Sequence, residues 1–188
     1  GKSVGSFGHI STWSFCQDKI LTTGGEGGMV STNDEKLWKK MWSYKDHGKN
    51  WDKVFNHKNK AGFRWLHDEF GSNFRLSELQ SCIGRIQLRK LSQWNKIRNR
   101  NANILYKNLI NIPCLRLEKP EQSYHHGFYK FYCYIKPDNL HNDCNRDKII
   151  NEINELGYPI FHGGCSEVYL EECFNRKNCS QKQRLPIA

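Results

Sequence analysis

Four glycines within residues 24–28 restrict the fold of this chain more than any other feature of its sequence. They follow one β-prone run, residues 10–15, and precede a second, residues 29–32, so we expect a tight turn between two strands. Lys19 lies between the runs. If both strands are buried, desolvation should lower the pKa of the Lys19 ammonium group and favour the neutral amine that attacks carbonyl groups. The residues alone leave a second interpretation open, in which Lys19 is a surface lysine of an ordinary hairpin.

A helix is predicted directly after this region. Asn33 and Asp34 are suitable N-caps for a helix over residues 35–44, which should end near His47 and Gly48. A histidine at the end of a helix suits two roles. It can contact a substrate or cofactor, or it can cap the C-terminus of the helix, and the sequence does not choose between these roles.

A longer helix is predicted further along the chain. Ser77 and Glu78 precede an apolar pattern of helical spacing that continues to about residue 109. This pattern is longer than most helices, so we expect a bend or break, with a boundary between two lobes near residues 95–100. Residues 49–72 show no periodicity, and a connection of that length is expected to be functional or mobile.

The remainder of the chain indicates an α+β arrangement. Strand-like runs occur at residues 114–117, 128–135 and 159–161. Asp143 is a candidate N-cap for a further helix, which Gly157 should stop. We therefore expect an α/β domain over residues 1–95 and a small α+β domain over residues 96–188, the second one truncated at its C-terminus.

Composition restricts the class of protein. The formal net charge is +10, but the basic residues are scattered and no nucleic-acid-binding motif accompanies them, so such a module is the less favoured alternative. No apolar run is long enough to span a membrane and no signal peptide is visible, which predicts a cytoplasmic protein. The eight cysteines form no C-x-x-C pair, which favours free thiols. A zinc site could be drawn from His162, Cys165, Cys173 and Cys179, but their spacing is unlike that of zinc motifs, and we predict no metal.

Two motifs carry a resemblance to a known family. Ser14, Phe15, Lys19 and residues 24–30 resemble the Schiff-base lysine segment of the DegT/DnrJ/EryC1/StrS aminotransferases, with Gly25 as one extra residue in the turn. Residues 71–88 resemble a second motif of that family, and the likeness runs along the whole chain. The resemblance implies the type I fold of aspartate aminotransferase, with pyridoxal 5'-phosphate as cofactor.

The resemblance also implies roles for individual residues. Lys19 would bind the cofactor covalently and move a proton, while Ser14 would hydrogen-bond the cofactor phosphate. Asn73 would reach the cofactor phosphate of a neighbouring subunit in a homodimer, and His47 and Arg75 would lie near the substrate. Relatives that dehydrate sugars have histidine in place of the lysine. Lys19 therefore argues for transamination from glutamate, which leaves 2-oxoglutarate, to a nucleotide-linked keto-sugar.

Parts of such an enzyme have no counterpart in this sequence. The family's aspartate that pairs with the pyridine nitrogen, and its aromatic residue that stacks on the ring, precede the segment matched here. We therefore expect a fragment of a longer enzyme, inactive in isolation, from cell-surface polysaccharide or amino-sugar biosynthesis. A noncatalytic or regulatory protein of the same fold is the alternative, against which the presence of Lys19, Ser14 and Asn73 argues.

Overall fold

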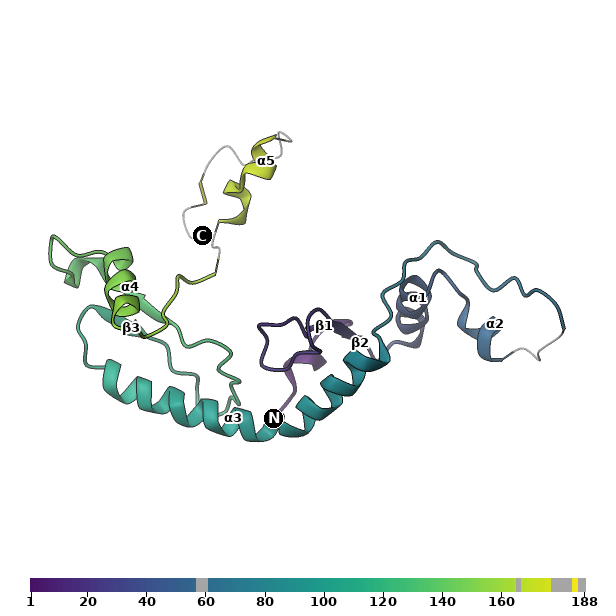
Figure 1. Cartoon of the computed structure of the whole chain (residues 1–188), viewed down its shortest axis with the longest axis horizontal. Coiled ribbons are helices and arrows are strands. Elements are labelled where there is room, and N and C mark those ends of the chain that lie inside the picture. The colour runs from purple at the N-terminus through teal and green to yellow at the C-terminus, as the bar shows by residue number, and fades with distance from the viewer. Residues whose placement is uncertain (57–60, 165–166, 177–183, 186–188) are drawn as a thin grey trace. The chain divides into compact units, whose positions relative to one another are not determined.

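The computed structural model describes residues 1–56, 61–164, 167–176 and 184–185. The chain divides into two compact units, each considered separately below (Figure 1). The first comprises residues 1–105 and 120–131, and the second comprises residues 106–119 and the chain from residue 132 onward. The segment 120–131 therefore belongs with the N-terminal part of the chain. The domain ranges expected from sequence, 1–95 and 96–188, stay a prediction.

A two-stranded antiparallel ribbon contains the predicted turn. Strand β1 (Ser11–Ser14) pairs with β2 (Gly28–Ser31), with Ser11 opposite Ser31 and Ser14 opposite Gly28. The expectation that both strands are buried is wrong for this chain. Side chains of β1 alternate between half-buried and exposed, and most of β2 is exposed. Within the described residues no third strand joins this sheet, so neither strand is flanked by neighbours on both sides.

The helix predicted after the ribbon is confirmed as α1 (Glu35–Lys45). Asp34 Oδ1 accepts a hydrogen bond of 3.0 Å from the backbone N–H of Leu37, which is the geometry of an N-cap. The nonperiodic segment beyond it contains a short helix, α2 (Trp51–Phe55), that the sequence pattern did not reveal. Five residues are too few to show a helical period.

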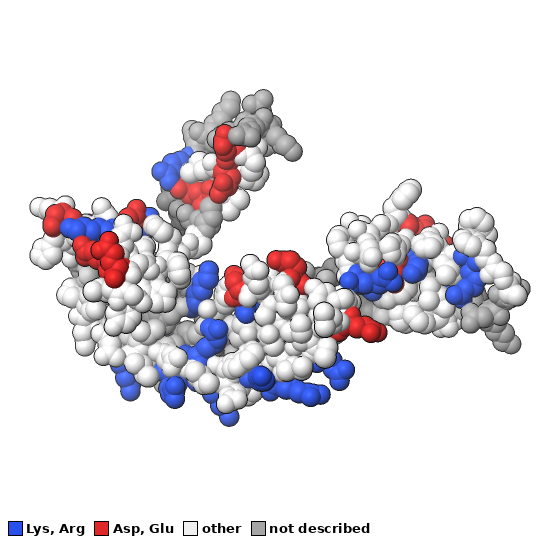
Figure 2. Space-filling view, in the orientation of Figure 1, with Lys and Arg blue, Asp and Glu red and all other residues white. Residues whose placement is uncertain are grey.

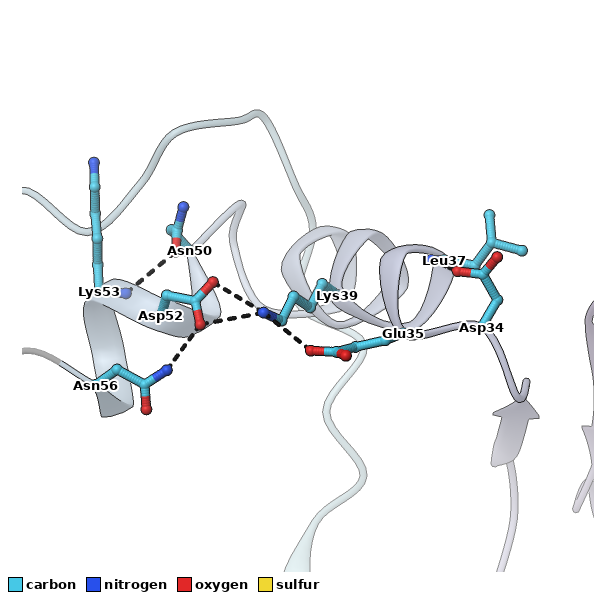
Figure 3. A network of polar contacts seen from close by, with 8 residues as sticks. All are labelled: Asp34, Glu35, Leu37, Lys39, Asn50, Asp52, Lys53 and Asn56. Carbon is cyan, nitrogen blue, oxygen red and sulfur yellow. Dashed lines mark hydrogen bonds and ion pairs between the residues drawn. The ribbon is translucent and has the colours of Figure 1, made fainter.

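Helices α1 and α2 are joined by aromatic and charged contacts. The Trp51 ring lies 4.6 Å from the Trp38 ring and 4.9 Å from the Trp42 ring, centroid to centroid. Beside them, Lys39 Nζ contacts the carboxylates of both Asp52 and Glu35, as Figure 3 shows. These contacts hold α2 against α1 although α2 is only about one turn long.

Helix α3 (Glu78–Leu109) begins where the sequence predicts. Its first turn is a capping box, because Ser77 Oγ accepts from the Gln80 N–H and Gln80 Oε1 accepts from the Ser77 N–H. The helix is continuous over 32 residues, so of the expected bend or break the break does not occur, while Figure 1 shows the helix to be curved. Within residues 95–100, the Asn99 side chain donates a hydrogen bond to the Asn95 carbonyl, and the helix continues through both residues.

The second unit is α+β, as predicted. Strand β3 (Leu115–Leu117) pairs antiparallel with β4 (Cys133–Ile135), and helix α4 (Arg146–Glu155) follows. Gly157 has a φ of 85° and ends the helix as expected. The described part of the unit also contains helix α5 (Glu172–Arg176) and one-turn 3₁₀ helices at Pro137–Asn139 and Val168–Leu170. In the first unit, a 3₁₀ helix spans Val4–Ser6.

Three predictions for this part of the chain are wrong in detail. The strand expected over residues 128–135 contains only residues 133–135, and Phe128, with a φ of 43°, cannot be part of an extended strand. The N-cap of α4 is Asn145, which accepts from the Lys148 N–H, and not Asp143. No strand forms at residues 159–161. The mixed α/β class is nevertheless confirmed.

Candidate active site

The glycine-rich turn is attached to the N-terminal half of α3. The Thr22 N–H donates to Gln87 Oε1 at 2.9 Å, and Gln80 Nε2 donates to the carbonyl of Glu26 at 2.7 Å. Between these bonds Thr23 is only 2% exposed. Gln80 and Gln87 both belong to the second sequence motif, so the two motifs meet in space and fix the loop that carries Lys19.

Close packing explains why this attachment needs glycine. A Cβ atom on Gly27 would lie 2.1 Å from Thr23 Oγ1, and one on Gly84 would lie 2.9 Å from Thr23 Cγ2. Both distances are shorter than atoms tolerate. Gly24 and Gly25 have φ values of 79° and 141°, which supply the reversal of the chain.

Lys19 lies between an acid and a phenol. Its Nζ is 3.4 Å from Tyr129 Oη and 3.5 Å from Asp18 Oδ1, and it lies over the Tyr129 ring. The Tyr129 hydroxyl donates a short hydrogen bond to the Asp18 carboxylate. The Cys16 thiol also donates to that carboxylate, at 2.8 Å. The side chain of Lys19 is 34% exposed, so its amine is accessible from solvent.

These neighbours stabilise the charged form of the lysine. The hydrogen bond to Tyr129 raises the pKa of Lys19 and outweighs partial desolvation, and Asp18 adds to the effect. Hydrogen bonds from Cys16 and Tyr129, together with Lys19, hold the pKa of Asp18 well below its usual range. The expected lowering of the Lys19 pKa is therefore wrong for this chain. The hydroxyl and the carboxylate stabilise the ammonium form by more than desolvation destabilises it.

Sequence reasoning missed Asp18 and Tyr129. Asp18 adjoins Lys19, but only the folded loop shows that its carboxylate is within reach of the amine. Tyr129 is 110 residues away from Lys19 and was assigned to a strand. An aromatic residue in a run of aromatic residues gives no signal that it contacts a distant lysine.

A second group of predicted residues gathers at the end of α1. Asp46 and Asn73 form an isolated antiparallel bridge, and Asn73 Oδ1 accepts from Arg75 Nε at 3.2 Å. Arg75 Nε is also 3.8 Å from Asp46 Oδ1, and Lys49 Nζ is 3.1 Å from the same oxygen. The structure therefore brings Asn73 and Arg75 together around an acid, Asp46, that is only 8% exposed.

His47 takes the left-handed conformation that ends α1. Its φ is 61°, its backbone N–H donates to the carbonyl of Ser72, and its side chain is exposed. Gly48 follows with a φ of 78°, and a Cβ there would lie 1.7 Å from the carbonyl oxygen of Glu69. The His47 backbone thus ends the helix. The side chain lines an open hollow with His67, Asp68, Glu69, Phe70 and Gly71.

The five predicted site residues form two separate groups. Lys19 and Ser14 lie on or beside the ribbon, whereas His47, Asn73 and Arg75 lie beyond α1. Among the described residues, no hydrogen bond or ion pair joins one group to the other. Ser14 is exposed at the end of β1, where its Oγ accepts from the Cys16 N–H at 3.4 Å.

The chemistry of these groups fits a phosphorylated aldehyde. Lys19 offers an accessible primary amine, which can bond covalently to a carbonyl carbon. Ser14 offers an exposed hydroxyl that can donate to a phosphate oxygen. In the part of the chain that the structure describes, no cluster of side chains could hold a metal ion, and Cys165 and Cys179 of the zinc hypothesis lie outside it. None of the helices described here is long and apolar enough to cross a membrane.

Comparison with known proteins identifies the class. The model of the DegT/DnrJ/EryC1/StrS aminotransferase family matches residues 1–186, and the chain belongs to this family. The type I fold predicted from the two motifs is thereby confirmed.

Individual relatives are similar over much of the chain. The X-ray structure of an aminotransferase from Psychrobacter cryohalolentis is 48% identical, with a TM-score of 0.92 over 100% of this chain and 49% of that one. A UDP-N-acetyl-3-dehydro-alpha-D-glucosamine 3-aminotransferase of Acidithiobacillus ferrooxidans is 35% identical over 70% of this chain and 32% of its own length. An E. coli GDP-4-keto-6-deoxy-D-mannose-3-dehydratase, solved with bound hydrated pyridoxal phosphate (PLP), is 25% identical, with a TM-score of 0.68 over 85% of this chain and 41% of that one.

Two points follow from these matches. The chain spans about a third to a half of the length of the proteins that it matches. Membership of the family indicates PLP as the cofactor, the group present in the dehydratase structure. The accessible amine of Lys19 is a group that could bond to its aldehyde carbon.

Proposed function

We propose that this chain is the lysine-bearing part of a PLP-dependent aminotransferase that transfers an amino group from glutamate to a nucleotide-linked keto-sugar. The observation that supports it most is Lys19 itself, an accessible amine on a loop that both family motifs hold in place. The name of the Acidithiobacillus relative, a UDP-sugar 3-aminotransferase, supports a nucleotide-sugar substrate.

PLP, when bound, withdraws electrons from the carbon that carries the amino group and so makes its proton removable. Lys19 would hold the cofactor covalently through Nζ. When its amine is free, Lys19 would hold and move the proton of the substrate carbon. Ser14 donates a hydrogen bond to the cofactor phosphate, and Asn73 does the same for the neighbouring subunit of a homodimer. His47 and Arg75 lie on the substrate side.

The complete enzyme, in this proposal, is longer than the present chain and works in the cytoplasm. The proposal assigns to its remaining part the acid that pairs with the pyridine nitrogen and the aromatic residue that stacks on the ring. The similar proteins are two to three times as long as the segment matched, which supports this assignment. Its product would enter cell-surface polysaccharide or amino-sugar synthesis.

The test is a transamination assay on the protein encoded by the complete reading frame. Purified protein is incubated with PLP, glutamate and one of two acceptors, a UDP-linked 3-keto-sugar or a GDP-linked 4-keto-6-deoxy-sugar. We expect 2-oxoglutarate to form in step with the amino-sugar for one of them. Lys19→Ala should abolish this product, since no other side chain replaces both the covalent bond and the proton carrier.

Lys90→Ala is the matched control, because Lys90 is an exposed lysine on α3, in the region of the chain that contacts the glycine-rich turn. It should leave the rate unchanged. Activity that survives in Lys19→Ala, or no 2-oxoglutarate with any nucleotide-linked keto-sugar, would contradict the proposal. The second result would favour the noncatalytic alternative.

A further inference from the structure

Tyr129 reaches Lys19 from a segment that α3 holds in place. Arg98 Nη1 donates to the backbone carbonyls of Phe128, at 3.1 Å, and of Tyr129, at 3.4 Å. One helical position further, Asn99 Nδ2 donates to the carbonyl of His126 at 3.0 Å. Two adjacent side chains of α3 therefore bind three of the carbonyls in the segment 126–129 and fix its path.

The backbone of this segment is strained at one residue. Phe128 has a φ of 43°, a conformation that is unfavourable for an aromatic residue. The Phe128 N–H donates to His126 Nδ1 at 3.0 Å, and its carbonyl accepts from Arg98. Strain of this kind persists only where the surroundings impose it. Its effect here is to turn the Tyr129 side chain away from the path of a strand and toward Lys19.

We propose that Tyr129 is a positioning residue for Lys19, anchored by Arg98, and that its hydroxyl holds the Lys19 amine beside the Asp18 carboxylate. The Tyr129 hydroxyl contacts both partners, since it accepts from Lys19 Nζ and donates to Asp18. One phenol thus sets the distance between the amine and the acid. The proposal rests on the proposed function, because it concerns the same lysine, and it adds a residue from a distant part of the chain.

The role of this arrangement is to keep the free amine protonated. Lys19 has to give up a proton as well as take one, and a hydrogen-bond acceptor at Nζ favours the ammonium form. The groups that face Lys19 are the Asp18 carboxylate, the Cys16 thiol and the Tyr129 hydroxyl. Lys130 Nζ lies 5.4 Å from the Tyr129 ring centroid and is a further charge in contact with Tyr129.

The test measures the reactivity of the Lys19 amine, without PLP. The complete protein is treated with a low concentration of acetic anhydride at a series of pH values. Mass spectrometry then gives the acetylation rate of the Lys19 peptide. Tyr129→Phe keeps the ring and removes the hydroxyl, so the curve for Lys19 should move to lower pH. At about pH 9 we expect at least about a twofold rise in rate, since the neutral fraction of an amine follows its pKa.

Two further variants make the result decisive. Tyr132→Phe, three residues away, is the matched control and should leave the Lys19 curve in place. Arg98→Gln removes the bond to both carbonyls while keeping a polar side chain, and it should shift the curve in the same direction as Tyr129→Phe. It also gives an answer if Tyr129→Phe does not fold.

The acetylation curves of the variants either support the proposal for Tyr129 or overturn it. A Lys19 curve that is unchanged in folded Tyr129→Phe, or one that moves equally in Tyr132→Phe, would overturn the proposal. A shift confined to Tyr129→Phe and Arg98→Gln supports it. Because the labelling needs neither cofactor nor substrate, failure of the transamination assay would remove the proposed function and leave this measurement unaffected.

Discussion

Lys19 shows how far a residue's neighbours decide its chemistry. Its pKa is raised, first by the hydrogen bond to Tyr129, so the free amine stays protonated to a higher pH than an ordinary lysine. Attack on a carbonyl requires the neutral amine. The reaction of the cofactor-free lysine with an aldehyde should therefore become faster as the pH rises. The pH range of this increase should lie above the range found for an ordinary lysine.

Ser14 and Asn73 have a different predicted role from that of Lys19. Each would contribute a hydrogen bond to a phosphate, which is worth about 1–3 kcal/mol for a charged acceptor. In the complete protein, Ser14→Ala and Asn73→Ala should release PLP more readily during dialysis, while borohydride still fixes bound PLP to Lys19. Ser92→Ala, an exposed serine of α3, is the control and should retain PLP like the unmodified protein. Unchanged retention in both variants would remove these residues from the cofactor site.

At the scale of elements, the packing of the turn on α3 makes a prediction about Gly84. Alanine normally stabilises a helix by about 1 kcal/mol relative to glycine. A Cβ at this position would lie 2.9 Å from Cγ2 of the buried Thr23, so Gly84→Ala should lower the unfolding temperature. In a Thr23→Ser background the methyl group is gone, and the same substitution should raise it. Thermal unfolding of the four proteins tests this; stabilisation in both backgrounds would contradict the described packing.

The link between α1 and the segment 73–75 should weaken in acid. Burial alone would raise the pKa of Asp46, but the hydrogen bond from Lys49, with the charges of Arg75 and Lys45, lowers that pKa below its ordinary value. A carboxylate with a lowered pKa in the folded state contributes stability above its unfolded pKa and loses it as the pH falls through the folded value. Denaturant unfolding at about pH 5 and about pH 3 should therefore show a smaller acid-induced loss in Asp46→Asn. Exposed Asp138→Asn should behave like the unmodified chain; equal losses in all three proteins would refute this assignment.

Elements defined by local chemistry could be predicted from the sequence. Asp34 caps α1 and Ser77 begins α3, because a cap depends on residues only three positions apart. The prediction of Asp143 as the N-cap of α4 failed, since Asp and Asn both cap helices well and only the backbone path selects Asn145. The short helix α2 is fixed by aromatic contacts with α1, which no local pattern records.

The candidate site could be predicted only in part for the same reason. Lys19, Ser14 and Asn73 could be proposed as site residues because they lie within motifs. Tyr129 could not be found, because its position depends on strain at Phe128 and on bonds from Arg98, both set by tertiary packing. The aromatic run around it has high strand propensity, and here the contacts with α3 override that propensity.

At the scale of the whole molecule, the net positive charge is the feature that most favours the nucleic-acid-binding alternative. The net charge is +10, and Figure 2 shows Lys and Arg along α3, and Lys and Arg together with Asp and Glu in the region of α1. On α3, exposed basic residues recur on one helical face, at Arg85, Arg89, Lys96 and Arg100. Such a row can attract any polyanion, and an anionic nucleotide-sugar uses the same field.

Binding to nucleic acid should nevertheless be weak. We expect no binding of the complete protein to duplex DNA tighter than about 10 micromolar in about 0.15 M salt, because so short a row of basic residues contacts few phosphates and releases few counterions. A fluorescence anisotropy titration measures this directly. Sub-micromolar affinity that falls steeply with salt, and that Arg89→Ala and Lys96→Ala reduce, would favour the nucleic-acid alternative.

The most direct test of the account is where PLP becomes attached. The complete protein is mixed with PLP, reduced with borohydride, digested, and the modified lysine is found by mass spectrometry. The account predicts a single dominant label on Lys19, absent from Lys19→Ala and unchanged in Lys90→Ala. A dominant label on a different lysine, with Lys19 unmodified, would contradict the assignment of Lys19 and the function built on it.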